Sequence, residues 1–130
     1  MRLFLFPTIA FIIFVFCGVS YGPSVKTVYL NQNTTNFASP WELNVYPGDR
    51  VNFLTTNGEF SINIPNANSI FEEVSSPNLL IHLNSSNPQS QTYTAKSAES
   101  YLSQEYSAYC ITLGTYPDAP PRIIRITSQE

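Results

Sequence analysis

The chain of 130 residues has room for one small domain, and its content of 43% hydrophobic and 14% aromatic residues supplies a packed core and excludes a disordered chain. Only 12% of the residues are charged and the formal net charge is −3, so there is no basic face to neutralise phosphates, and nucleic-acid binding is disfavoured. One His, two Cys and one Met leave few side chains suited to a metal or a proton relay.

The N-terminal segment has the features of a signal peptide. Arg2 precedes an apolar run, Leu3–Phe16, which is shorter than the roughly 20 residues that a membrane-spanning helix needs. Small residues near Ser20 favour cleavage there. We therefore expect a signal peptide over residues 1–20 and a secreted, periplasmic or cell-surface protein with no integral membrane segment after cleavage. Retention of the segment as an anchor and lipidation at Cys17 stay open as alternatives.

The domain that remains after cleavage, residues 21–130, has to fold without an internal disulfide. Five basic and nine acidic side chains remain, which give it a net charge of −4. Cys17 leaves with the signal peptide, so Cys110 is the lone cysteine of the domain. The sequence shows no internal repeat and no linker, and we expect one domain held together by its hydrophobic core.

From Val25 onward the sequence predicts an all-β domain. Apolar and polar residues alternate with a period of two, and clusters of Asn, Gly, Pro and Ser separate the short segments. The expected strands are Val25–Leu30, Trp41–Tyr46, Arg50–Thr55, Glu59–Ile64, Leu79–Leu83, Gln91–Ala95, Glu105–Ile111 and Arg122–Thr127. About eight short strands in a domain of this size predict a two-sheet Greek-key β-sandwich.

Turn residues indicate how some of these strands are joined. Pro47-Gly48-Asp49 is typical of a tight turn with a positive φ at its glycine, and Asn57-Gly58 is a strong hairpin dipeptide. We expect these two turns to join the second, third and fourth strands into a meander. Asp49 is expected to accept hydrogen bonds from nearby backbone N–H groups. A single helical turn is expected over Ala98–Gln104.

Three stretches of the sequence carry a family resemblance: Val45–Phe53 reads VYPGDRVNF, Tyr106–Cys110 reads YSAYC, and Pro121–Ile126 reads PRIIRI. In this order they resemble the cupredoxins, in which a V-x-P-G-D-x-V-x-F stretch opens a strand pair and a Tyr-x-Tyr/Phe-x-Cys strand delivers the copper thiolate. A loop that carries His and usually Met then leads into the last strand of that family. The resemblance covers most of residues 40–127 and implies a cupredoxin-like β-sandwich.

Most copper ligands of that family are missing from this sequence. A type 1 site needs two imidazoles, a thiolate and a weak axial ligand such as Met. Phe60 or Ser61 falls where the resemblance places the first His, and the loop Ile111–Pro120 contains neither His nor Met. Of the implied ligands only Cys110 is present, so we expect a domain without a type 1 copper site and without a cofactor. Copper bound at an atypical site stays open as an alternative.

Cys110 and His82 are the remaining candidates for metal or redox chemistry. Cys110 is the one candidate metal ligand and could also join two chains in a dimer, but it lies on the inward phase of its strand, where free cysteines are usually small buried hydrophobes. His82 is out of phase with its apolar neighbours and is expected to face solvent. The two side chains therefore point apart, which disfavours a shared Cu(I) site.

Candidate binding residues are found among the aromatic side chains and in the loop before the last strand. Trp41 and Tyr116 are the candidate contact aromatics, because Trp and Tyr presented from loops anchor partners or stack on sugar rings. Asp118 lies in the same loop as Tyr116, and the prolines around it limit the freedom of both side chains.

The sequence therefore predicts an exported, non-catalytic binding protein on a cupredoxin-like scaffold, with a protein or glycan partner that it does not identify. No nucleophile elbow accompanies the single His, so Ser-His-Asp chemistry is disfavoured, and we predict no enzymatic activity. Two alternatives stay open. One is a periplasmic copper-binding or electron-transfer protein whose atypical site is completed by a partner chain or by dimerisation through Cys110, and the other is a carbohydrate-binding module.

Overall fold

The computed structural model describes residues 23–127, and the predicted signal peptide, residues 1–20, lies outside them. Within this range short strands follow one another, with one short helix between the fifth and sixth. The elements are β1 (Val25–Asn31), β2 (Ala38–Ser39), β3 (Glu42–Val45), β4 (Arg50–Asn57), β5 (Phe60–Pro65), α2 (Ala67–Ile70), β6 (Asn78–Leu83), β7 (Tyr93–Thr94), β8 (Leu102–Glu105), β9 (Ser107–Cys110) and β10 (Arg122–Arg125). No helix in residues 23–127 is long and apolar enough to cross a membrane.

The first layer is a four-stranded sheet in the order β2-β1-β4-β7. β1 and β4 run parallel at its centre, with Val28 opposite Phe53, and the short strands β2 and β7 flank them in antiparallel orientation. Val28 and Leu30 of β1 are fully buried, as are Val51 and Phe53 of β4. The period-two alternation of the sequence thus directs one face of each strand into the core.

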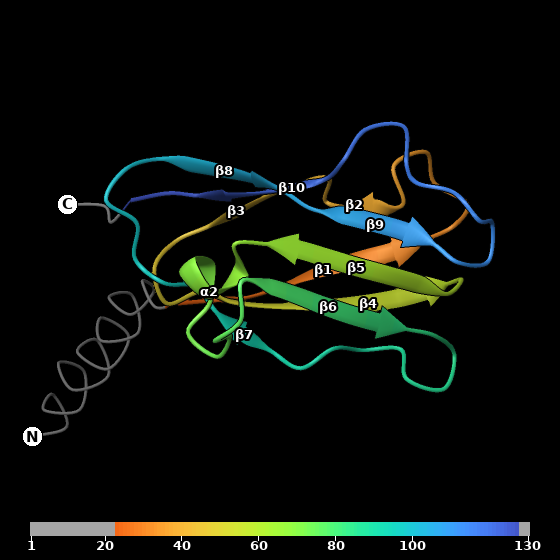
Figure 1. Ribbon diagram of the computed structural model, residues 1–130, viewed down its shortest axis with the longest axis horizontal. Helices are drawn as coiled ribbons and strands as arrows, with labels where there is room; N and C mark the ends of the chain where they lie inside the picture. The colour runs from red at the N-terminus through yellow and green to blue at the C-terminus, as the bar shows by residue number, and fades with distance from the viewer. Residues whose placement is uncertain (1–22, 128–130) are drawn as a thin grey trace, which may run out of the picture.

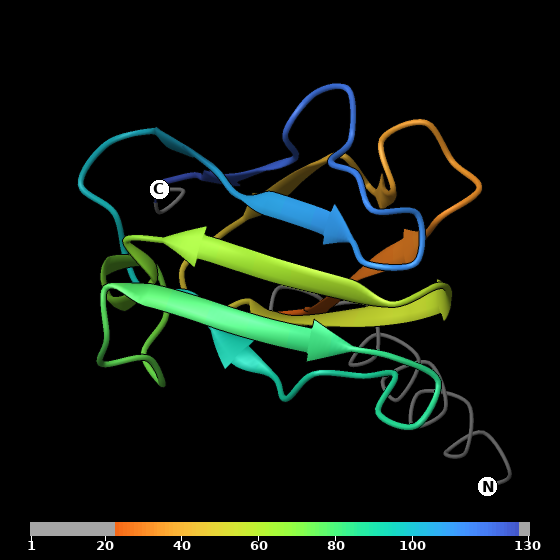
Figure 2. The ribbon, with the colours of Figure 1, turned by 45° about the vertical axis from the view of Figure 1, so that its right-hand side comes forward.

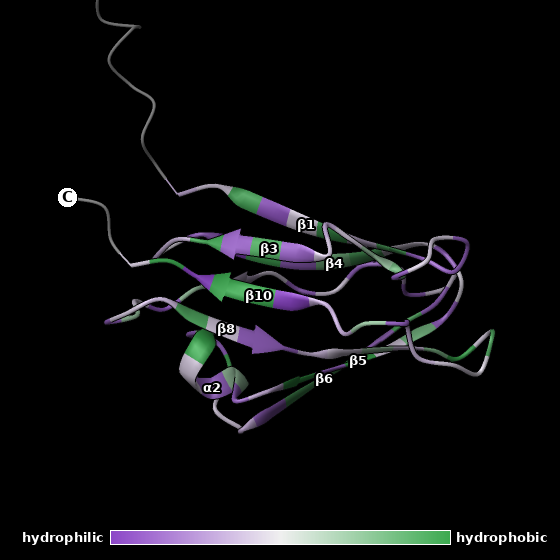
Figure 3. Cartoon of the chain, turned by 90° about the horizontal axis from the view of Figure 1, so that it is seen from above, coloured by the Kyte–Doolittle hydropathy of each residue, from purple (hydrophilic) through white to green (hydrophobic). Residues whose placement is uncertain are grey.

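The second layer consists of β3-β10-β8 and β6-β5-β9, and the chain runs directly from one part into the other. β8 ends at Glu105 and β9 begins at Ser107, so only Tyr106 separates them. The backbone N–H of Tyr106 donates to the carbonyl of Pro121 at 3.0 Å, which continues the pairing with the β10 segment. Figure 1 shows how β8 leads into β9, and Figure 3 shows β3, β10 and β8 side by side, with β5 and β6 beyond them.

Aromatic rings connect the two layers through the core. Phe53 of the first layer packs edge-to-face against Tyr106 of the second, with ring centroids 5.8 Å apart. Such a pair contributes about 0.5–1.5 kcal/mol beyond the burial of its area. The Tyr106 ring is almost completely buried, and this burial raises the pKa of its hydroxyl. Figure 2 shows β4 behind β5, the two layers that this core joins.

Each of the predicted strand segments contains a strand, and the all-β sandwich is confirmed. The structure adds β2, β8 and the helix α2, which the sequence pattern does not indicate. The helical turn predicted over Ala98–Gln104 is wrong, since Leu102–Glu105 forms β8 and pairs antiparallel with β10. The tertiary pairing with β10 overrides the local preference of this polar segment.

The predicted meander is also wrong. β3 pairs with β10 in the second layer, β4 pairs with β1 and β7 in the first, and β5 returns to the second. The two turns therefore carry the chain from one layer to the other and back, as in a Greek-key sandwich. Turn residues specify where the chain reverses, whereas the partner of each strand is decided by side-chain burial far away in the sequence.

Asp49 organises the turn between β3 and β4, as predicted. Gly48 has a φ of 87°, and the Asp49 carboxylate accepts hydrogen bonds from the backbone N–H groups of Tyr46 at 2.9 Å and Ser24 at 3.1 Å. Its Oδ2 also lies 3.0 Å from Nζ of Lys26. Burial alone would raise the pKa of Asp49, but these hydrogen bonds and the ammonium group outweigh it, so the pKa lies below its ordinary value.

Candidate functional site

Apolar side chains close the end of the sandwich where the family resemblance implies copper. Cys110 ends β9, is fully buried and lies directly opposite Phe60 of β5. The Phe60 ring packs edge-to-face against Phe37, with centroids 5.6 Å apart. Backbone hydrogen bonds hold the following turn closed, from Cys110 N–H to the Thr115 carbonyl at 2.9 Å and from Gly114 N–H to the Cys110 carbonyl at 2.8 Å.

The donor set at this end does not fit a type 1 copper site. Phe60 is the cross-strand partner of Cys110, whereas such a site needs two imidazoles beside the thiolate. His82 is exposed on the outer face of the sheet, as predicted, where its Nε2 lies 2.5 Å from Oε2 of Glu59. Among residues 23–127 no group of three or more His, Cys, Asp or Glu side chains could hold a metal ion. The burial of Cys110 argues against the open alternative of a dimer joined through this residue.

A groove lies on the outer face of the second layer, beside the loop that precedes β10. We call it the loop groove. Its volume is about 330 Å³, and its lining residues are Asn63, Pro65, Glu105, Tyr106, Ser107, Tyr116, Pro117 and Pro120. Tyr116 is one of the predicted contact residues, and the prolines on both sides of Asp118 line the same wall. This volume is at the lower end of the range for small-molecule sites.

The ring of Tyr116 forms one wall of the loop groove and packs against a second aromatic ring. Tyr116 is 61% exposed, and its ring packs edge-to-face against Tyr109 of β9 with centroids 4.8 Å apart. Pro117 and Pro120 continue the wall and restrict the backbone on both sides of Asp118. A ligand therefore meets an aromatic side chain whose ring already has a partner and whose loop has little conformational entropy left to lose.

The floor of the loop groove comes from neighbouring strands. Asn63 of β5 pairs with Ser107 of β9, and both point away from the core because Ile62 and Ala108 point into it. The Oδ1 atom of Asn63 is buried and has no hydrogen-bond partner among the described residues. Glu105 adds a carboxylate at the end of β8. The floor thus offers several hydrogen-bond acceptors beneath an aromatic wall.

Trp41 supports the loop groove from outside. Its indole N–H donates to the Ala119 carbonyl at 3.2 Å, and the Arg122 guanidinium lies over its ring, 5.2 Å from the centroid. Arg122 also donates from Nη2 to Oε2 of Glu105 at 3.1 Å. The ring face and the N–H of Trp41, a predicted contact residue, are therefore engaged within the protein, where they hold the loop and the Glu105 carboxylate in place. Asp118 is exposed on the same loop and does not line the groove.

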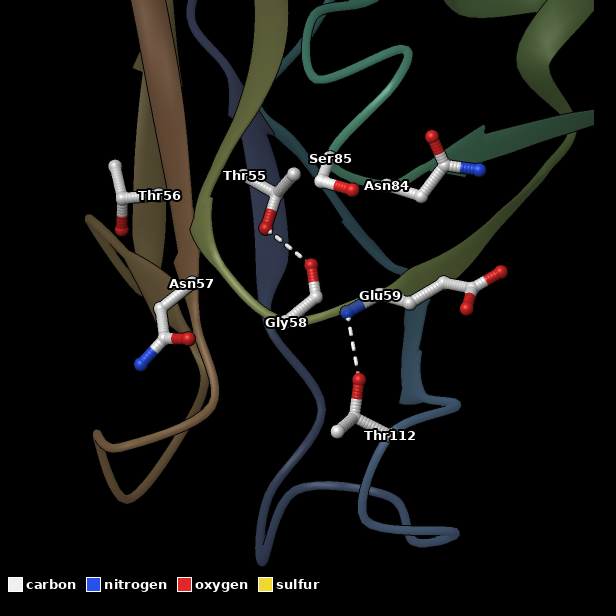
Figure 4. A pocket seen from close by; sticks show the side chains of 8 residues that line it. All are labelled: Thr55, Thr56, Asn57, Gly58, Glu59, Asn84, Ser85 and Thr112. Atoms are coloured by element: carbon white, nitrogen blue, oxygen red, sulfur yellow. Dashed lines mark hydrogen bonds between the residues drawn. The ribbon is translucent and has the colours of Figure 1, made fainter.

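A second hollow, the polar cleft, lies at the turn between β4 and β5 (Figure 4). Its volume is about 380 Å³, and Thr55, Thr56, Asn57, Gly58, Glu59, Asn84, Ser85 and Thr112 line it. Several of its polar groups already bond the backbone: Thr55 Oγ1 donates to the Gly58 carbonyl at 2.7 Å, and Thr112 Oγ1 accepts from Glu59 N–H at 2.8 Å. Asn84 Oδ1 accepts from two backbone N–H groups of its own turn. These bonds stabilise loops and leave the loop groove as the stronger candidate.

Sequence reasoning identified the loop of this groove but missed its floor. Asn63, Pro65 and Ser107 occupy the outward positions of strands whose inward positions were recognised. The alternation was therefore a usable signal for their orientation. What the alternation cannot supply is the register that sets Asn63 beside Ser107, or the position of the Tyr116 loop over them.

Comparisons with known proteins give matches among solved structures. No family model matches the sequence, and a search of curated proteins gives no significant match. Among solved structures, a novel purple cupredoxin from Nitrosopumilus maritimus is similar, with 17% identity over 77% of this chain and 98% of that chain and a TM-score of 0.46. A mutant of amicyanin in its reduced Cu(I) form at pH 4 has 16% identity over 84% of this chain and 87% of that chain, with a TM-score of 0.45. Both TM-scores are below 0.5, so neither neighbour transfers a function or a residue role.

Proposed function

We propose that the protein is an exported, non-catalytic binding protein that uses the loop groove on a cupredoxin-like scaffold without a type 1 copper site. The observation that carries this proposal is the supported Tyr116 wall above the acceptors of Asn63, Glu105 and Ser107. An exposed aromatic ring leaves apolar surface in contact with water, which does not stabilise an isolated domain. On a restricted loop the same ring favours recognition, because little conformational entropy is lost on binding.

The surroundings of the ionisable groups support binding rather than catalysis. A Ser-His-Asp arrangement would depend on His82, which contacts Glu59 on an open sheet face. Asp49 and Glu73 accept hydrogen bonds from backbone N–H groups, and Glu105 is paired with Arg122. The hydrogen bonds from Thr94 hold the pKa of Glu73 below its ordinary value despite the opposing effect of burial. Each of these carboxylates thus has a structural partner.

Copper titration separates this function from the copper-protein alternative. Protein produced from the full chain would be purified after export, its N-terminus sequenced, and the sample titrated with Cu(I) and Cu(II) beside Cys110→Ser. We expect a new N-terminus after Ser20, no intense visible absorbance, and no rise in melting temperature beyond that of the variant. Stoichiometric binding that depends on Cys110 and stabilises the fold would contradict a metal-free binding protein.

A fragment screen by two-dimensional NMR tests the location of the site. We expect ligand-induced shifts to gather at the amides of Ser107 and Tyr116 and to disappear in Tyr116→Ala. Shifts concentrated instead at the polar cleft, or scattered over the surface, would contradict the assignment of the loop groove.

A further inference from the structure

The aromatic wall of the loop groove suits a flat ligand face made of C–H groups. The face of an aromatic ring carries partial negative charge, so it attracts the polarised C–H bonds of a pyranose ring. Tyr116 is 61% exposed and is supported by Tyr109, and Pro117 and Pro120 extend the apolar surface beside it. The wall is therefore apolar and rigid, and the polar groups of the groove lie below it.

The floor offers both acceptors and donors, because the Asn63 amide and the Ser107 hydroxyl can donate as well as accept. Asn63 Oδ1 has no partner among the described residues, and the Glu105 carboxylate and Ser107 hydroxyl both accept hydrogen bonds. Two nearby N–H groups are already used, since the Trp41 indole bonds the Ala119 carbonyl and the Tyr106 backbone bonds the Pro121 carbonyl. A ligand rich in hydroxyl groups, each of which both donates and accepts, matches this mixture of polar groups.

The charges around the loop groove favour a neutral ligand over an anionic one. Glu105 lines the groove, Asp118 stands exposed on the loop beside it, and the whole chain is acidic. The nearby cation Arg122 already forms ion pairs with Glu105 and Glu42 and lies over the ring of Trp41. A uronate or sulfated sugar would therefore meet carboxylates without a free cation at the groove, and a neutral sugar avoids this repulsion.

We propose that the ligand of the loop groove is a neutral glycan, one pyranose ring of which packs on Tyr116 while its hydroxyl groups form hydrogen bonds with the Glu105 carboxylate and the Asn63 amide. This inference rests on the proposed binding function and adds the chemical class of the ligand. Trp41 and Arg122 act as positioning residues, because they hold the loop and the Glu105 carboxylate without lining the groove.

The test is an array of immobilised neutral and anionic oligosaccharides, probed with the purified protein and followed by calorimetry on the strongest neutral oligosaccharide. Tyr116→Ala should lower the affinity by about tenfold or more, and Tyr116→Phe should stay within about threefold, because the ring is retained. Glu105→Gln should weaken binding while keeping the shape of the groove. Tyr101→Ala is the matched control, since Tyr101 is 63% exposed and does not line the groove. Circular dichroism of each variant verifies that it folds.

Several results would overturn the inference. They are the absence of binding to neutral glycans, a preference for anionic ones, and an affinity that Tyr116→Ala leaves unchanged. A parallel panel of proline-rich and mixed peptides separates this failure from failure of the proposed function. If peptides bind in a Tyr116-dependent way and glycans do not, the glycan assignment is wrong and the binding groove stands. If the NMR screen finds no Tyr116-dependent ligand of any kind, the proposed function fails as well.

Discussion

Replacement of Asp49 by asparagine tests how the turn between β3 and β4 is stabilised. The carboxylate accepts backbone hydrogen bonds from Tyr46 and Ser24 and lies 3.0 Å from the Lys26 ammonium, and its side chain is only 6% exposed. The amide of Asp49→Asn keeps one acceptor oxygen, so one backbone bond and the ion pair are lost. A charge-assisted hydrogen bond is worth about 1.5–3 kcal/mol, and Lys26 retains contact with water, so we expect a loss of about 2–3 kcal/mol at pH 7.

The effect of pH on this variant follows from the lowered pKa of Asp49. A carboxyl group whose pKa is lower in the folded state than its ordinary value of 3.8 stabilises the fold fully well above that value. That contribution declines as the pH falls through 3.8 toward the folded-state pKa, because the unfolded chain binds the proton first. The difference between wild type and Asp49→Asn should therefore be largest at pH 7 and smaller by about 1 kcal/mol near about pH 3.

Urea unfolding followed by the fluorescence of the single tryptophan measures this difference at both pH values. Asp118→Asn is the matched control, since Asp118 is exposed and the same substitution there should change the free energy of unfolding by less than about 0.5 kcal/mol. A loss below about 1 kcal/mol for Asp49→Asn at pH 7, or an equal loss at both pH values, would refute the reasoning.

Three further predictions concern the closed end of the sandwich and the support of the groove. The Cys110 thiol should react with a disulfide reagent only after unfolding, and rapid reaction in native buffer would show that the burial is wrong. Phe60→Ala should lower the free energy of unfolding by about 3–5 kcal/mol in urea titrations, because it leaves a cavity beside Cys110; a loss below about 1 kcal/mol contradicts this packing. Arg122→Met should cost about 1 kcal/mol and change the fluorescence emission of Trp41, whereas an unchanged spectrum would contradict the contact between guanidinium and indole.

The strands were predictable because each buries one face. Phe60, Ile62 and Ile64 alternate with polar residues, and this local signal survives in the structure as β5. Helix α2 was not predictable by the same means. Its four residues are too few to show a helical period, and its N-cap residue, Asn66, has a φ of 55° and makes no capping hydrogen bond through its side chain. The helix depends on the burial of Ala67 and Ile70.

The site was predictable only in its local part. Tyr116 and its prolines are adjacent in sequence, and their role as a stiff aromatic loop follows from composition alone. The contacts of Trp41 could not be predicted, because its partners, Ala119 and Arg122, lie more than seventy residues away in the chain. Exposed aromatic residues and aromatic residues that support a distant loop look alike in a sequence, and only the tertiary contacts distinguish them.

The single residue between β8 and β9, Tyr106, links two parts of the second layer whose backbone hydrogen bonds can open separately. All strand pairing of β8 is with β10 and all strand pairing of β9 is with β5, so Tyr106 joins two otherwise separate hydrogen-bonded units. In native-state hydrogen exchange we expect these two units to open separately, each with its own free energy. Glu105 and Ser107 line the loop groove from the two sides of this junction. An occupied groove would bridge both units, so a ligand on the surface would slow amide exchange in both halves of the sheet together.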